Sequence, residues 1–194
     1  MFNGIIYNQG KIVFLKKNKK SLILGIKTKL RFTRKDIGSS VCCNGACLTL
    51  LNIKNHIVQF YLSIETLNKT NFKNATLGEF VNLERSLKYG DEVSGHFLQG
   101  HVDTIGRIQK IKIIDKSWFV KIVFPKQYSK FIVEKGSIGI NGVSLTVSKL
   151  SKNVITLAVI PHTLKLTNLL NLKTNSIINI ELDIFAKYLK KINN

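Results

Sequence analysis

A short motif occurs twice in the chain and carries side chains suited to ligand chemistry. Asn44-Gly-Ala-Cys-Leu-Thr49 returns as Asn141-Gly-Val-Ser-Leu-Thr146, at an offset of 97 residues (141 − 44). Each copy places a thiol or hydroxyl group beside a tight turn: Cys47 and Thr49, then Ser144 and Thr146. Such groups can bond a heterocycle or a polyol while the backbone N–H groups stay accessible. The alternative is a purely structural turn whose Thr bonds the backbone.

The two copies differ in their titratable and nucleophilic groups. These differences are His101 in the place of Ile5, Cys47 against Ser144, Glu65 against His162, and Ser86 against Asp183. A symmetric frame with unlike reactive groups can hold two similar molecules and treat them differently. We therefore take His101 and Asp183 as acid–base candidates and Cys47 as a candidate nucleophile. A solitary histidine can equally be structural.

Further matches at nearly the same offset indicate that a whole domain is duplicated. Val81–Glu84 corresponds to Ile178–Glu181, and Gly10–Ile12 corresponds to Gly106–Ile108. A repeat this long predicts two domains of one fold. The expected division is residues 1–94 for the first ligand-binding domain, 95–183 for the second, and 184–194 for a C-terminal helix.

Each copy reads as a series of short strands with one small helix. Asn-Gly is typical of a type I′ hairpin turn, so residues 40–52 and 137–149 each predict a hairpin. Residues 1–13 and 101–113 each predict a first strand, and in the first copy Gly4 and Gly10 bend it. Six strands in about 90 residues predict a closed antiparallel barrel, so the chain is expected to be all-β.

The C-terminal segment has no counterpart in the first copy. Its apolar residues fall on one helical face: Ile184, Phe185, Tyr188, Leu189 and Ile192. The helix either covers its own barrel or makes a contact between subunits.

Composition limits the function classes. The net charge is +19 and the pI is about 10.0, but the positive residues are nearly all Lys and are scattered, which argues against nucleic acid as a partner. We find no apolar run long enough for a membrane span and no signal peptide, so we expect no membrane partner and a cytoplasmic location. Cys42, Cys43 and Cys47 lack partners for a disulfide framework or a zinc site, so we expect reduced thiols and no metal.

Several blocks together resemble the riboflavin synthases of the α-chain type. These blocks are residues 1–6, 40–49, 95–103, 141–146, 160–163 and 179–183, and the likeness runs from residue 1 to about 190. The resemblance implies two tandem six-stranded Greek-key barrels plus a C-terminal helix, assembled as a homotrimer, with association with lumazine synthase as a further expected contact. It implies dismutation of two molecules of 6,7-dimethyl-8-ribityllumazine, both held in one active site, by four-carbon transfer. The products are riboflavin and 5-amino-6-(D-ribitylamino)uracil, and no cofactor is needed.

The resemblance also implies the site residues and places the site between the N-terminal barrel of one subunit and the C-terminal barrel of another. The expected catalytic residues are His101, Cys47, Ser144 and Asp183. The expected substrate-binding residues are Gly4, Ile5, Ile6, Ser40, Cys47, Leu48, Thr49, Tyr61, Leu62, Ser63, Ile64, Glu65, Thr66, Gly100, His101, Val102, Lys135, Ser144, Leu145, Thr146, Ala158, Val159, Ile160, Pro161, His162 and Thr163.

Three positions depart from the family pattern, and two other functions compete. Asn3 stands where the family usually has Thr, Tyr7 where it often has Glu, and Asn141 where some members have Asp. None of these removes an expected catalytic residue. The first competing function is a lumazine or flavin carrier without activity, as in the fluorescent antenna proteins of this fold. The second is a basic barrel that binds nucleic acid, which predicts aromatic residues clustered on one face, and we see none.

Overall fold

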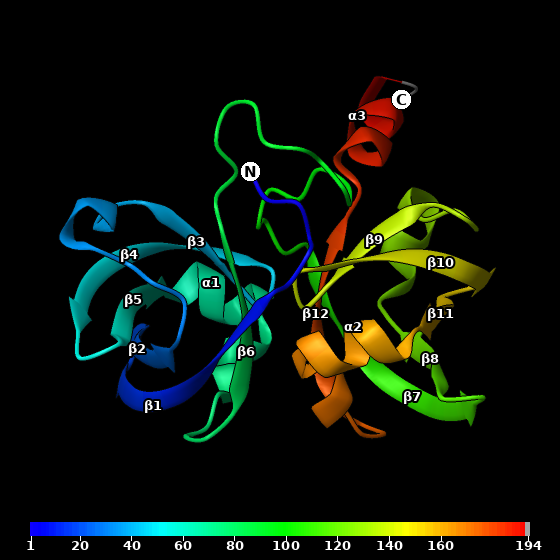
Figure 1. Ribbon diagram of the computed structural model, residues 1–194. Helices are drawn as coiled ribbons and strands as arrows, with labels where there is room; N and C mark the ends of the chain where they lie inside the picture. Colours follow the sequence, from blue (N-terminus) through cyan, green and yellow to red (C-terminus); the bar gives the residue numbers. More distant parts are fainter. Residues whose placement is uncertain (193–194) are drawn as a thin grey trace.

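The computed structural model describes residues 1–192 and contains two closed antiparallel barrels of six strands each (Figure 1). The first barrel has the strand order β1-β2-β5-β4-β3-β6, and the second has β10-β11-β8-β7-β12-β9. The strands of the first are β1 (Asn8–Asn18), β2 (Ser21–Thr28), β3 (Ser40–Cys43), β4 (Ala46–Lys54), β5 (Ile57–Ser63) and β6 (Phe80–Arg85). Those of the second are β7 (Thr104–Ile114), β8 (Ser117–Val123), β9 (Ser137–Ile140), β10 (Val143–Ser151), β11 (Val154–Val159) and β12 (Ile177–Leu182). The predicted pair of six-stranded barrels is confirmed.

Apolar and polar residues alternate along the strands, so that each barrel encloses a core of its own. In β5, Val58, Phe60 and Leu62 are buried while Tyr61 is exposed, as expected for a strand with one face inward. The strand register shifts between Ile12 and Phe14 in β1 and at the matching place in β7, between Ile108 and Lys110. Bulges of this kind bend strands and help a sheet to close. The duplication therefore extends to the irregularities of the sheet.

Short helices follow the fifth strand of each barrel. They are α1 (Ile64–Lys69) with the 3-10 turn Asn71–Asn74, and α2 (Pro161–Leu166) with the 3-10 turn Asn168–Asn171. Two further 3-10 turns, Arg34–Asp36 and Lys126–Phe131, lie between strands. The turn Lys126–Phe131 begins directly after Pro125.

The first strand of each copy begins later than the sequence predicts. Residues 1–7 lie outside β1 and residues 101–103 lie outside β7, although we expected strands over 1–13 and 101–113. Gly4 and Gly100 have φ angles of +75° and +76°, which no strand residue adopts. Each segment instead leaves its own barrel, as described for the site below.

The barrels meet turn to turn at the repeated Asn-Gly pairs. Gly45 and Gly142 have positive φ, and a Cβ on Gly45 would lie 2.8 Å from the Gly142 nitrogen. Glycine is therefore needed both for the turn and for the close approach. The predicted hairpin turns are confirmed, and they also form the joint between the barrels.

A buried asparagine network surrounds this joint with near two-fold symmetry. Asn82 Nδ2 donates to the Asn141 carbonyl at 2.9 Å, and Asn179 Nδ2 donates to the Asn44 carbonyl at 2.8 Å. Asn44 and Asn141 accept the backbone N–H groups of Asn82 and Asn179, each at 2.8 Å. Asn141, which departs from Asp in some relatives of the resembled family, thus has the same role as Asn44.

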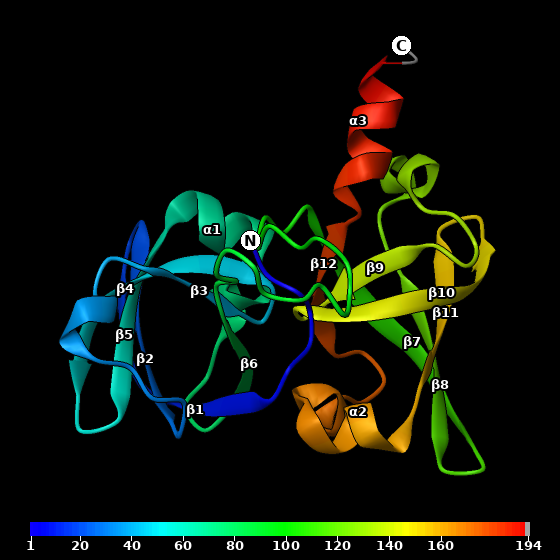
Figure 2. The same ribbon diagram turned by 45° about the horizontal axis from the view of Figure 1, so that its top comes forward.

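The C-terminal helix α3 (Ile184–Ile192) follows β12 and projects away from both barrels (Figures 1 and 2). Phe185, Tyr188, Leu189 and Ile192 are 60–76% exposed. The helix therefore does not cover its own barrel. None of the helices in residues 1–192 is long and apolar enough to cross a lipid bilayer.

Candidate active sites at the exchanged segments

The segments that precede the two barrels are exchanged between them. The Ser144 N–H in the second barrel donates to the Gly4 carbonyl at 2.9 Å, and the Cys47 N–H in the first barrel donates to the Gly100 carbonyl at 2.7 Å. Ile6 belongs to the core of the second barrel, and Val102 packs against the core of the first. Each binding site is therefore built from one barrel and the other copy's leading segment.

Both exchanged segments need glycine at the contact. A Cβ on Gly4 would lie 2.7 Å from the Ser144 nitrogen and Cβ, and one on Gly100 would lie 2.6 Å from the Cys47 Cβ. Contacts below 3.0 Å and positive φ angles both exclude a side chain. The close approach puts the backbone of these segments directly beside Ser144 and Cys47.

The half-buried Glu84 and the buried Glu181 hold the exchanged segments. Glu84 accepts the N–H groups of Asn3 at 2.7 Å and Gly4 at 3.0 Å. Glu181 accepts those of Gln99 at 2.6 Å and Gly100 at 3.0 Å. Burial raises the pKa of Glu84 to about 7 and also raises the pKa of Glu181, while these backbone hydrogen bonds act in the opposite direction.

The second barrel carries a cleft of about 160 Å³ beside Ser144. Its walls are residues 4–7 of the leading segment, Val143 and Ser144 of β10, and residues of the α2 region that include His162 and Thr163. The Ser144 Oγ lies 2.7 Å from Nδ1 of His96. The cleft thus combines apolar walls, a fixed hydroxyl and backbone groups, which suits a polar heterocycle.

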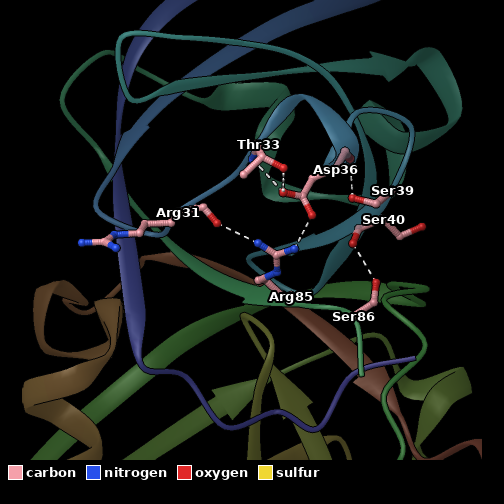
Figure 3. Close-up of polar contacts among 7 residues, drawn as sticks. All are labelled: Arg31, Thr33, Asp36, Ser39, Ser40, Arg85 and Ser86. Carbon is pink, nitrogen blue, oxygen red and sulfur yellow. Dashed lines mark hydrogen bonds and ion pairs between the residues drawn. The ribbon is translucent and has the colours of Figure 1, made fainter. Parts of the chain in front are cut away.

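The first barrel places Cys47 beside Gly100. Its rim is built differently from that of the second barrel, through polar contacts of Asp36, Arg85 and Ser86 (Figure 3). The Ser86 hydroxyl donates to the Ser40 carbonyl at 2.7 Å. Arg85 donates to the Arg31 carbonyl at 2.7 Å and forms an ion pair with Asp36. A hydrogen bond from the Thr33 backbone N–H, helped by Arg85, holds the pKa of Asp36 below its ordinary value. These contacts tie the loop before β3 to the end of β6.

The predicted binding residues fall into exposed and buried groups. Thr49, Tyr61, Ile64, Glu65, Lys135, Thr146, Ala158, Ile160, Pro161 and His162 are exposed. The side chains of Leu48, Leu62 and Val159 lie in the barrel cores, so only their backbone groups are free to meet a ligand. Leu145 packs against the second core, and the Ser63 hydroxyl accepts the Thr66 N–H at 3.3 Å as the N-cap of α1.

The predicted catalytic residues do not form one cluster within the chain. Asp183 Oδ1 accepts the Phe185 N–H at 2.9 Å at the start of α3, and the His101 side chain is exposed. Within residues 1–192, no hydrogen bond or ion pair joins Cys47 or His101 to Ser144 or Asp183. Cys42 and Cys43 are buried, and burial raises the pKa of both thiols.

The predicted binding residues did not include Tyr7, Val143, Leu166 and Thr167, which line the second cleft, or His96, which contacts its Ser144. Tyr7 lines the cleft, although we noted this residue only as a departure from the family pattern. His96 bonds to Ser144, although it entered only as part of the block 95–103. The sequence feature that could have identified His96 is its position five residues before His101 in the same block.

Comparisons with known proteins agree with this geometry. The model of the lumazine binding domain matches residues 3–86 and again 99–183. A riboflavin synthase from Photobacterium leiognathi is 35% identical over 99% of this chain and 88% of its own length. The riboflavin synthase from Escherichia coli (strain K12) is 36% identical over 94% of this chain and 87% of its own length.

Solved structures with ligands also resemble the chain. The crystal structure of LumP complexed with riboflavin has a TM-score of 0.84 and 28% identity, and covers 94% of this chain and 99% of LumP. That of LumP complexed with 6,7-dimethyl-8-(1′-D-ribityl) lumazine has a TM-score of 0.81 and 27% identity, with coverage of 93% and 98%. Two matched repeats, near full-length relatives and a shared two-barrel structure show that the chain belongs to the lumazine-binding family of the riboflavin synthases.

Proposed function

We propose that the protein is a riboflavin synthase that converts two molecules of 6,7-dimethyl-8-ribityllumazine into riboflavin and 5-amino-6-(D-ribitylamino)uracil, the last step of riboflavin biosynthesis. The observation that carries this proposal is the pair of equivalent but unlike sites, Gly4 beside Ser144 and Gly100 beside Cys47. Two identical substrates need two similar sites. A dismutation needs the two molecules to be treated differently.

The size of the second cleft supports a site shared by two substrate molecules. Its volume of about 160 Å³ is below the roughly 300–1,000 Å³ of pockets that enclose a drug-sized ligand. A lumazine seated there would leave part of its ring uncovered. A second ring could then stack on the exposed face.

In the proposed reaction, one lumazine loses a proton from its C7 methyl group and the other takes a nucleophile at C7. Holding both rings in antiparallel register supplies much of the rate enhancement, because positioning the two reactants makes a bimolecular step effectively unimolecular. We assign proton movement to His101 and Asp183, and contacts at the reacting ring to Ser144 and Cys47. Within residues 1–192, no hydrogen bond or ion pair joins Cys47 or His101 to Ser144 or Asp183, and we propose that each active site lies between the N-terminal barrel of one subunit and the C-terminal barrel of the next.

The C-terminal helix is the proposed element of a homotrimer. Its apolar face is open, and its base is anchored by an ion pair between Lys187 and Asp103 at 2.7 Å and an edge contact between the rings of Phe97 and Phe185. Burial of four exposed apolar side chains would provide a driving force for assembly. Leu189→Lys should convert the assembly to monomers in sedimentation experiments with and without lumazine, whereas Lys191→Gln should not. A monomeric wild type under both conditions would exclude the trimer. We place the protein in the cytoplasm, with lumazine synthase as a candidate associate.

The direct test is incubation of the purified protein with 6,7-dimethyl-8-ribityllumazine and quantification of both products. We expect riboflavin and the pyrimidine in equal amounts, without added cofactor.

A carrier is the second candidate, because the LumP structures hold riboflavin or the lumazine. One tightly held ligand per chain without riboflavin formation would identify a carrier. The retained Ser144, Thr146 and Thr163 in the second barrel favour the enzyme.

A further inference from the structure

His96 is directed at a residue of the second cleft. It lies in the segment before β7, and its Nδ1 is 2.7 Å from the Ser144 Oγ. Ser144 lines the cleft, whereas His96 does not. Any effect of His96 on a bound ring must therefore pass through the Ser144 hydroxyl.

The environment of His96 leaves this hydrogen bond as its only polar contact. Its Nε2 is buried and has no hydrogen-bond partner within residues 1–192. Burial lowers the pKa of His96, while the charge of Asp183 acts in the opposite direction. A neutral imidazole has one donor nitrogen and one acceptor nitrogen. If Nδ1 is the acceptor, the Ser144 O–H donates to it, and if Nδ1 carries the proton, Oγ accepts the hydrogen bond. In either tautomer the bond at Nδ1 fixes the position of Oγ.

The backbone around His96 is fixed from the first barrel. The Gly95 N–H donates to Asn3 Oδ1 at 2.7 Å, and the Asn3 N–H donates to Glu84 Oε1 at 2.7 Å. A Cβ on Gly95 would lie 2.0 Å from the Asn3 carbonyl oxygen and 3.1 Å from the Ser144 Cβ. A chain of hydrogen bonds therefore runs from Glu84 through Asn3 and Gly95 towards His96 and Ser144.

Within residues 1–192, the site at Cys47 has no hydrogen-bonded imidazole that matches His96 at Ser144. The Cys47 N–H bonds to the Gly100 carbonyl just as the Ser144 N–H bonds to the Gly4 carbonyl. However, no hydrogen bond within residues 1–192 joins the Cys47 thiol to a histidine. The backbones of the two sites are equivalent, and His96 adds to the difference between their side chains.

We propose that His96 is a positioning residue that holds the Ser144 hydroxyl towards the substrate ring in the second cleft, and thereby adds to the difference between the Ser144 and Cys47 sites towards two identical molecules. This inference rests on the proposed function, whose site it refines. The inference assigns contact with the ring to Ser144 and the orientation of Ser144 to His96.

The experiment compares three substitutions at His96 in the full chain. A misplaced reacting group costs about 100-fold in rate, so His96→Ala and His96→Gln should lower kcat by about 10- to 100-fold while KM changes by less than about threefold. His96→Asn places an amide where Nδ1 lies and should recover most of kcat. The control is His56→Asn, because His56 is exposed in a turn with φ of 61°, which Asn tolerates. Circular dichroism and thermal midpoints establish that each variant is folded.

A double-mutant cycle with Ser144→Ala shows whether His96 acts through Ser144. If it does, His96→Ala should have little further effect in the Ser144→Ala background. Additive losses, wild-type kcat in the Ala and Gln variants, or an Asn variant as impaired as Ala would each overturn the inference. If the wild type makes no riboflavin, the proposed function fails. In that case the positioned hydroxyl can act only on binding, so the same cycle is measured through the dissociation constant of 6,7-dimethyl-8-ribityllumazine. Non-additive losses of affinity support the inference, and additive losses or unchanged affinity overturn it.

Discussion

The two barrels share one backbone plan but differ where the chain enters and leaves them. The first barrel receives Gly100 beside Cys47, and its last strand is followed by Ser86, which bonds to Ser40. The second receives Gly4 beside Ser144, and its last strand is followed by Asp183, which caps α3. Duplication thus supplies two equivalent sites. The segments before the first strand and after the last strand of each barrel differ, and they supply different reactive groups and a helix for assembly.

The difference teaches that symmetry is strictest where the barrels touch. The Asn-Gly turns, the buried asparagines and the two glutamates match across the pseudo-two-fold axis. A change there disturbs both copies, because each of these groups contacts the other barrel or the segment exchanged with it. The histidines and the loop before β3 make no such reciprocal contacts and can differ.

The largest expected effect follows from substituting the glycines of the exchanged segments. Gly4→Ala and Gly100→Ala each combine an unfavourable φ with a contact of 2.6–2.7 Å, so each should destabilise the protein by more than about 4 kcal/mol or abolish turnover. Gly38→Ala is the matched control, because its φ is +91° but no atom lies within 4 Å of the added Cβ. It should cost only about 1–2 kcal/mol. Urea unfolding measures all three, and a mild effect at Gly4 alone would show that the exchange is needed in only one barrel.

The next effect concerns the asparagine network. The Asn82 side chain bonds to Asn141 and twice to Asn168, whereas the Asn179 side chain bonds once to Asn44 and once to Asn71. Each buried group left unpaired costs about 1–3 kcal/mol, so Asn82→Ala should cost about 4 kcal/mol and Asn179→Ala about 1 kcal/mol less. Denaturant titrations give the comparison. Equal losses would mean that the additional bond to Asn168 contributes nothing.

The sequence predicts the duplicated barrels because their signals are local. Alternating apolar residues and Asn-Gly turns depend on neighbours along the chain, and the C-terminal apolar stripe depends on helical spacing. These features suffice to locate most strands and the turns at Asn44 and Asn141.

The exchange of the leading segments is hidden from the sequence for a physical reason. Gly4 is equivalent to Gly100 whether each segment stays with its own barrel or crosses to the other, so the repeat is the same in both cases. His96 is hidden for a related reason. Comparison of the copies finds unlike pairs such as Cys47 and Ser144, but His96 acts through Ser144, which lies 48 residues away in the chain, and comparison of equivalent positions does not reveal such a contact.

The pH dependence of stability should differ between the two glutamates. The pKa of Glu84 is about 7 in the folded chain against an ordinary 4.5. Between pH 4.5 and 7 the unfolded chain has released this proton and the folded chain still holds it, so stability falls as pH rises and then levels off. Glu84→Gln should remove this fall, which is about 3 kcal/mol. At Glu181 burial also raises the pKa, but hydrogen bonds from the backbone, that of Gln99 first, and the charge of Lys187 oppose this shift, so Glu181→Gln should flatten the curve less.

Urea unfolding at several pH values tests this comparison. Glu92→Gln is the control, because Glu92 is exposed. Curves for Glu84→Gln and wild type that stay parallel from pH 4.5 to 7 would contradict a buried carboxyl that titrates near neutrality.

The smallest expected effect compares the starts of the two short helices. Ser63 caps α1 through its bond from the Thr66 N–H, whereas α2 begins after Ile160 without a side-chain cap and has Pro161 in its first turn. Ser63→Ala should therefore lower the free energy of unfolding by about 1 kcal/mol. The separate variant Ile160→Ser should raise it by part of that amount, because it adds a cap to α2 and Ile160 is exposed, so little burial is lost. Thermal midpoints measure the stability, and lumazine titration measures the binding. If Ser63→Ala weakens binding while its midpoint stays that of the wild type, the hydroxyl serves the ligand and not the helix, and the two helix starts differ in function as well as in capping.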